Sequence, residues 1–353
     1  MTLLVAFVAA ALAFANGAND NFKGFATVWG ARALTYRRAL LLASVAALAG
    51  GAASVLLAET LVKAFSGKGL VDDAIASTPG FVFAAGGGAA AAVLVATRLG
   101  LPVSTTHALI GGLAGAGFGI GGAIDAGPLT RTFLLPLLLS PILAATLAWL
   151  GWTLLRPRSP ARDCVCVTVD QPVDSGGAAT AARTALVVDT SSACEAIDAP
   201  VRVTAAAARD TLHVASATAV CFARAVNDTP KLAGLLIATH ALDQRVSLIA
   251  VALVMTLGGL LFARRVAETM SLRIARIDAP SGLAANLITS GLVLCASLFG
   301  LPVSTTHVSV GAIAGATAGA RSLDWSTLRG VLLSWLATMP LAAAAAWALA
   351  SVL

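Results

Sequence analysis

The sequence predicts an all-α membrane protein of two inverted-topology repeats, with broken helices or re-entrant hairpins and about ten to twelve membrane segments. Its 353 residues are 58% hydrophobic and 11% charged, with a mean hydropathy of +0.89, whereas a soluble domain is about 25% charged. The eight-residue word GLPVSTTH occurs twice, at 100–107 and 300–307. Related words precede both copies, ANGANDNFKG at 15–24 and ARAVNDTPKL at 223–232. Matched polar words in two apolar halves indicate an internal duplication.

Apolar segments recur along the whole chain, five in each half. They fall near 2–18, 39–58, 81–97, 107–122 and 129–155, and then near 211–226, 246–262, 281–299, 307–320 and 327–352. Several are shorter than the about 20 residues that one membrane-crossing helix needs, and the short ones flank the repeated words. Non-helical backbone at membrane depth is tolerated only where protein or water covers it. We therefore expect half-helices or re-entrant hairpins at these words.

A polar stretch separates the two halves. The predicted organisation is a first membrane repeat over 1–155, a polar cytoplasmic linker over 156–209 and a second, inverted membrane repeat over 210–353. Arginines follow the first, fifth and seventh segments, as at Arg37, Arg162 and Arg265, and alternate crossings place them on one face. The positive-inside rule assigns that face to the cytoplasm, and it places Asp72 and both termini outside.

Several classes of protein are not supported. The formal charge of +6 and the pI of about 9.5 are explained by basic loops that orient a membrane protein, so no nucleic-acid partner is expected. Cys164 and Cys166 lack a second Cys or His pair at metal spacing, so neither a zinc site nor a disulfide framework is expected among the five cysteines. We find no GxxxxGK[ST] word, and no cofactor is expected.

Asp20 and Asp228 are carboxylates embedded in apolar segments at matched positions. A buried carboxylate is costly unless it meets a cation or takes a proton. With Asn19 and Asn227 beside them, these oxygens could bind a coupling cation, and Na⁺ at Asp20 and Asp228 is one candidate. The alternative is a carboxylate that caps a helix N-terminus at the membrane edge. Repetition of the word in both halves favours the buried site.

Each GLPVSTTH word places a helix-breaking proline before hydroxyl residues and a glycine-spaced apolar helix after them. The hydroxyl residues are Ser104, Thr105, Thr106, Ser304, Thr305 and Thr306. At a helix N-terminus the free N–H groups and the positive end of the dipole favour an anion, particularly an oxyanion. An ordinary N-cap is the alternative. We expect the glycines at every fourth position, from Gly111 and from Gly311, to serve close helix packing.

Four further residues stand beside these words. His107 and His307 could move protons or contact the anion, or they could each bond a neighbouring carbonyl. Lys23 and Lys231 lie four residues after the asparagine of each Asn-Asp pair. They could hold a fixed positive charge beside the aspartates or the anion, or they could reach toward the lipid headgroups.

These words resemble those of the inorganic phosphate transporters of the PiT type, which include bacterial permeases for phosphate or sulfate. The resemblance rests on GANDN at 17–21, AVNDT at 225–229, two PVSTTH words and their duplicated order, and it covers both halves. It implies an inverted-repeat fold in a bacterial cytoplasmic (inner) membrane, elevator-like movement, and phosphate uptake coupled to Na⁺ or H⁺. By match, the Asn-Asp pairs would bind cation and anion, and the six hydroxyl residues would hold the anion. A homodimer is also expected from the resemblance.

The chain departs from the family pattern at Lys23 and Lys231, which stand where the family word has asparagine. Two ammonium groups would offset half of the charge of two aspartates and a divalent oxyanion, and buried uncompensated charge is costly. We therefore expect weaker sodium dependence, and sulfate is the alternative substrate. An anion channel and an intramembrane serine hydrolase using Ser104 with His107 are remoter alternatives. Duplication of the whole set is unexpected for one catalytic centre, so no enzyme is predicted.

Overall fold

The computed structural model describes residues 2–57, 62, 65, 70–122, 124–155, 162–170, 183–196, 201–239, 242–319 and 322–353. The first half holds α1 (Thr2–Asp20), α2 (Ala26–Gly30), α3 (Tyr36–Leu57), α5 (Asp73–Ala76), α6 (Pro79–Arg98), α7 (Thr105–Gly119), α8 (Ala126–Pro128), the π-helix η1 (Leu129–Leu134) and α9 (Leu135–Leu155). The central part holds β1 (Cys164–Asp170), β2 (Arg183–Asp189), α10 (Ser191–Ala196) and β3 (Val201–Thr204). The second half holds α11 (Ala205–Ala238), α12 (Gln244–Phe262), α13 (Arg264–Glu268), η2 (Thr269–Arg273), α14 (Ala279–Leu298), α15 (Thr305–Gly319) and α16 (Trp325–Ala350).

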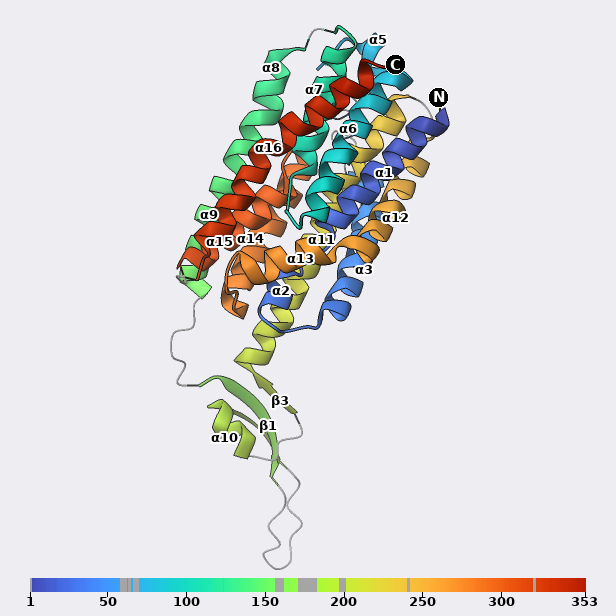
Figure 1. Ribbon diagram of the computed structural model, residues 1–353. Coiled ribbons are helices and arrows are strands. Elements are labelled where there is room, and N and C mark those ends of the chain that lie inside the picture. The colour runs from blue at the N-terminus through green and yellow to red at the C-terminus, as the bar shows by residue number, and fades with distance from the viewer. Residues whose placement is uncertain are drawn as a thin grey trace, which may run out of the picture.

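The helices form one elongated bundle (Figure 1). Seven helical stretches among the described residues are long and apolar enough to cross a bilayer. The 34-residue α11 and the 15-residue helices α7 and α15 lie within the same bundle. Large apolar side chains such as Leu138 and Leu336 stay exposed on its outside, where lipid tails are as apolar as leucine. The predicted all-α membrane fold is confirmed.

The two GLPVSTTH words form the tips of two helical hairpins, α6–α7 and α14–α15. Gly100 and Gly300 adopt φ of 71° and 67°, which glycine tolerates, and helix resumes only at Thr105 and Thr305. The two tips meet, because the hydroxyl of Thr306 donates to the Val103 carbonyl at 2.6 Å. The predicted re-entrant hairpins are therefore confirmed, and they are covered by protein rather than lipid.

The two Asn-Asp words differ in backbone structure, although their sequences match. α1 ends at Asp20 and a turn follows, whereas α11 continues without a break past Asp228 and Pro230 to Ala238. The predicted break is thus correct for the first half and wrong for the second. A proline inside a membrane helix is tolerated where neighbouring groups satisfy the freed carbonyl.

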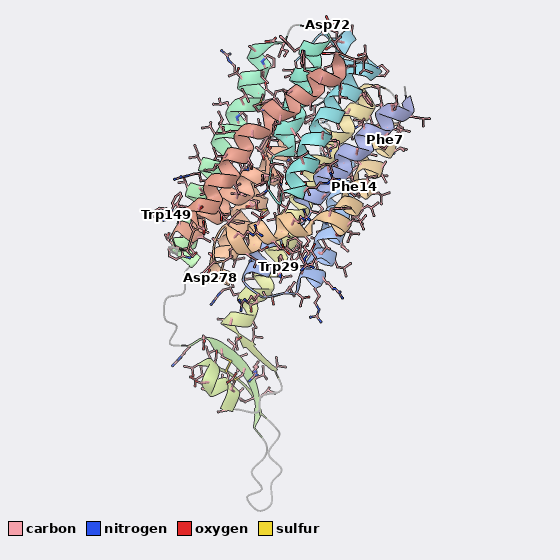
Figure 2. The ribbon with its side chains drawn as sticks, in the orientation of Figure 1. Phe7, Phe14, Trp29, Asp72, Trp149 and Asp278 are labelled. Carbon is pink, nitrogen blue, oxygen red and sulfur yellow. A yellow bond between two sulfur atoms is a disulfide. The ribbon has the colours of Figure 1, made fainter. Side chains whose placement is uncertain are left out.

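The termini and the sheet lie at opposite ends of the bundle (Figure 1). Asp72 lies at the end that holds the termini, whereas Trp29 and Asp278 lie at the other end (Figure 2). This agrees with the prediction that Asp72 and the arginine-rich loops lie on opposite faces.

Within the predicted linker, the described residues form a small sheet domain. Its strand order is β2-β1-β3, with both pairs antiparallel, and β3 leads directly into α11. A disulfide joins Cys164 to Cys194, with Cys166 buried beside them. The expectation of no disulfide is therefore wrong. Strand β1 and helix α10 are brought together only by the fold, so the 30-residue separation gave no local signal.

The spaced glycines pack the hairpins against two long helices. A Cβ added at Gly111 or Gly115 would lie 2.3 or 2.1 Å from a carbonyl oxygen of α16. A Cβ at Gly311 or Gly315 would lie 2.5 or 2.0 Å from a carbonyl oxygen of α9. The prediction that these glycines allow close packing is confirmed.

We expect Gly315→Ala to destabilise the protein by about 1–3 kcal/mol, because the new methyl group would clash with backbone that cannot yield. The clash is with the Ala145 oxygen. Thermal unfolding in detergent measures the effect. Gly291→Ala in α14 is the matched control, since no described atom outside the adjoining stretch of that helix lies within 4 Å of the Cβ position. Equal melting temperatures for the two variants would contradict the packing argument.

Candidate functional site

The structure gathers the predicted site residues between the two hairpin tips, the end of α1 and the middle of α11. All of them are buried: Asn19, Asp20, Lys23, Ser104, Thr105, Thr106, His107, Asn227, Asp228, Lys231, Ser304, Thr305, Thr306 and His307. Residues about 200 positions apart in the sequence therefore form one cluster at the interface between the halves.

The two lysines cross from one half to the other. Lys23 pairs with Asp20 and donates to the Thr306 hydroxyl of the opposite hairpin. Lys231 donates to the Thr106 hydroxyl at 3.1 Å and lies 3.7 Å from Asp228. Both lysine side chains are buried, so they do not extend toward the lipid headgroups, which was the alternative for these residues.

Asn19 and Asn227 form hydrogen bonds with the tips of the two hairpins. The Asn19 amide donates to the Thr97 hydroxyl at 2.9 Å and to the Leu101 carbonyl at 3.0 Å, and its oxygen accepts the Val103 N–H at 3.1 Å. The Asn227 amide donates to the Val303 carbonyl at 3.3 Å, and its oxygen accepts the hydroxyl of Ser297, near the end of α14, at 3.2 Å. These bonds fix the extended segments that precede α7 and α15.

The two serines cap the helices that they precede. Ser104 accepts the backbone N–H of His107 at 3.0 Å, and Ser304 accepts that of His307 at 3.2 Å. The N-cap alternative thus describes the serines. The hydroxyls of Thr106 and Thr306 instead contact the opposite half.

Sequence reasoning missed two central residues, Asn16 and Arg224. The Asn16 amide donates to Thr105 at 3.1 Å, to Asp228 at 3.3 Å and to Asp20 at 3.4 Å. Arg224 donates to the Asn16 oxygen at 3.1 Å and is only 1% exposed. The shift of 208 positions that aligns the Asn-Asp pairs also aligns these two residues, and that alignment was the signal available.

The described residues of this cluster carry more positive than negative formal charge. Two carboxylates, Asp20 and Asp228, face three cations, Lys23, Lys231 and Arg224. A buried excess of positive charge is unfavourable unless an anion compensates it. Hydroxyls and the N-termini of two half-helices add donors at the same place. The arrangement is therefore suited to bind a small oxyanion.

The sequence matches the model of the phosphate transporter family over residues 16–346. The chain belongs to the phosphate transporter family. It is 27% identical over 348 residues to the "Probable low-affinity inorganic phosphate transporter" of Bacillus subtilis, covering 97% of this chain and 94% of that one. The protein of the same name in Mycobacterium tuberculosis strain H37Rv is 27% identical over 358 residues, covering 97% and 75%.

A solved structure shares the fold. It is titled "The sodium-dependent phosphate transporter", and it matches with a TM-score of 0.75 and 21% identity over 99% of this chain and 98% of that one. Membership in the phosphate transporter family confirms the resemblance to PiT transporters, the multi-pass membrane location and the prediction that the chain is not an enzyme. The bacterial relatives agree with a cytoplasmic (inner) membrane.

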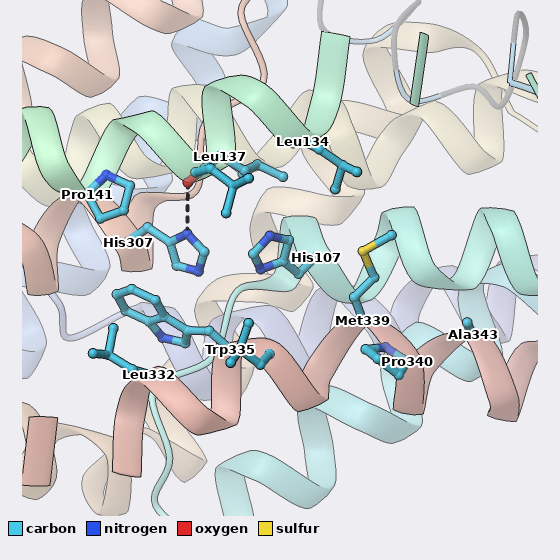
Figure 3. Close-up of a pocket in the computed structure, with 12 residues that line it drawn as sticks. His107, Leu134, Leu137, Pro141, His307, Leu332, Trp335, Met339, Pro340 and Ala343 are labelled. Atoms are coloured by element: carbon cyan, nitrogen blue, oxygen red, sulfur yellow. Dashed lines mark hydrogen bonds between the residues drawn. The ribbon is translucent and has the colours of Figure 1, made fainter. Parts of the chain in front are cut away.

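The two histidines of this phosphate transporter line an apolar cavity (Figure 3). The cavity has a volume of about 560 Å³ and lies between α9 and α16. The rings of His107 and His307 are 4.6 Å apart, and His307 stacks on Trp335 and bonds the Leu137 carbonyl. His307 therefore follows the second alternative, in which the histidine bonds a neighbouring carbonyl group. Among the described residues, no hydrogen bond joins a ring nitrogen of His107 to the Ser104 hydroxyl, which instead accepts the His107 backbone N–H, so the pairing that a hydrolase would require is not formed.

Proposed function

We propose that this chain is a secondary active transporter that imports inorganic phosphate by cation-coupled symport across the cytoplasmic membrane. The observation that carries the proposal is the meeting of two hydroxyl-bearing half-helix tips at a buried cluster with excess positive charge. Thr106 and Thr306 face lysines of the opposite halves there. An oxyanion held between the halves would thus contact both of them, as alternating access around a central site requires. A homodimer remains an expectation from the family.

We further propose that the two ammonium groups take the place of coupling sodium ions. Lys231 is surrounded by oxygen atoms, of the Val303 carbonyl at 2.6 Å, the Thr106 hydroxyl at 3.1 Å and the Asp228 carboxylate at 3.7 Å. Such oxygens are typical ligands of a hard cation. Lys23 similarly contacts Asp20 and Thr306. This supports transport with weak sodium dependence and with protons as the alternative coupling ion.

Uptake of radiolabelled phosphate or sulfate into proteoliposomes, with imposed sodium or proton gradients, tests the proposal. We expect phosphate to accumulate and the proton gradient to stimulate uptake more than the sodium gradient. Uptake of sulfate but not of phosphate would support the oxyanion site and would show that sulfate is the substrate. Uptake driven only by sodium would contradict the proposed role of the ammonium groups. Currents far above transporter turnover would indicate a channel instead.

A further inference from the structure

We infer that Arg224 is a direct ligand of the transported oxyanion, and that it makes the two halves of the binding site chemically unequal. The inference rests on the proposed function and names a substrate contact within it. It starts from the alignment of Arg224 with Asn16 in two otherwise similar words. One half thus offers a neutral amide where the other half offers a guanidinium.

The hydrogen bonds of Arg224 leave one edge of its guanidinium group free. Nη1 donates to Asn16 and lies 4.0 Å from the Asp228 carboxylate. Nε and Nη2 are buried and have no hydrogen-bond partner among the described residues. Leaving buried, charged donors unsatisfied costs more than the desolvation of neutral ones. The free edge therefore calls for a partner that this part of the chain does not supply.

The chemistry of that edge points to an oxyanion. Nε–H and the adjacent Nη2–H are parallel donors, and they match two oxygens of a phosphate or carboxylate group in bidentate geometry. A halide or a water molecule offers one acceptor atom that the two donors must share, whereas an oxyanion offers each donor an oxygen of its own. The ligand class is therefore a polyatomic oxyanion with two acceptor oxygens on one side, such as phosphate or sulfate.

The position of Arg224 agrees with this assignment. Asn16, which holds Nη1, also bonds Thr105 at the N-terminus of α7. Asn16 and Thr105 line a small pocket together with Thr106, Asp228 and Lys231. The guanidinium thus lies beside the tip of the first hairpin, although Arg224 belongs to the second half of the chain.

A purely structural role does not account for these contacts. If Arg224 only offset Asp228, we would expect a charge-assisted hydrogen bond between them, at about 2.7–2.9 Å. Nη1 of Arg224 lies 4.0 Å from the Asp228 carboxylate. That carboxylate instead accepts hydrogen bonds from the side-chain amides of Asn16 at 3.3 Å and Asn227 at 3.1 Å. The hydrogen bond to Asn16 orients the guanidinium group, and Nε and Nη2 stay without a partner among the described residues.

Equilibrium binding of radiolabelled phosphate and sulfate to the full-length purified protein tests the inference, with Arg224→Lys as the main variant. Lysine keeps the positive charge but lacks the fork. We expect its dissociation constant for phosphate to rise by about tenfold or more, with its melting temperature without phosphate little changed. Arg264→Lys is the matched control, because the Arg264 side chain is 72% exposed and far from being buried.

The outcomes separate the inference from the proposed function. Phosphate should raise the melting temperature of the wild type and of Arg264→Lys, and much less that of Arg224→Lys. Wild-type affinity in Arg224→Lys would overturn the role of Arg224 while the transporter assignment stands. Wild-type protein that binds neither phosphate nor sulfate would overturn the proposed function itself. A variant Arg224→Lys that melts well below the wild type without phosphate would show that Arg224 is structural.

Discussion

Asp20→Asn is expected to lower phosphate uptake by about a hundredfold or more, because removing one partner of a buried ion pair leaves an uncompensated charge. Asp20 is 1% exposed, and its carboxylate pairs with Lys23 and accepts the amide of Asn16. In the variant the ammonium group of Lys23 would lose its paired carboxylate and keep neutral acceptors, the new amide oxygen and the Thr306 hydroxyl. Initial rates of phosphate uptake into proteoliposomes measure the effect.

Asp324→Asn is the matched control for this substitution. Asp324 is exposed and caps α16 by accepting the Thr327 N–H at 2.8 Å. Asparagine caps helices about as well as aspartate, so this variant should transport normally. Uptake by Asp20→Asn within about twofold of the control would contradict a central role for the carboxylate.

Lys23→Asn is expected to make phosphate uptake depend on sodium about tenfold more steeply than in the wild type, because the site would need a mobile cation where the ammonium group was. The substitution restores the residue that the family word has at this position. Asp20 and Thr306, which contact Lys23, would then offer their oxygens to the ion. Uptake measured as a function of sodium concentration, at constant ionic strength, reports the change.

Arg329→Asn removes the same charge from an exposed position on α16 and serves as the control. Its sodium dependence should match that of the wild type. Equal sodium dependence in Lys23→Asn and Arg329→Asn would show that the ammonium group does not replace an ion. A wild type that already responds steeply to sodium would also contradict the proposal.

The sequence alone was sufficient for the membrane fold, for the duplicated words and for most residues of the candidate site, although Asn16 and Arg224 were missed. The hydropathy of a segment depends only on its amino-acid composition, so membrane segments can be identified without knowing which residues contact one another. Repeated words in the two halves, related at Asp20 and Lys23 and identical at GLPVSTTH, identified these residues and their partners, because repetition makes a chance match improbable. The hairpins at the GLPVSTTH words were predictable because proline and short apolar segments limit the local backbone.

Only the tertiary structure decided which side chains meet. The crossed contacts, from Lys23 to Thr306 and from Lys231 to Thr106, join residues that no local pattern relates. The continuity of α11 through Pro230 and the disulfide at Cys164 likewise depend on neighbours distant in sequence. The open edge of Arg224 became visible only once its partners were known. Composition and repeated words thus determine which segments enter the membrane and which residues form the site, whereas packing between the two halves determines which buried charges and donors are left for a ligand.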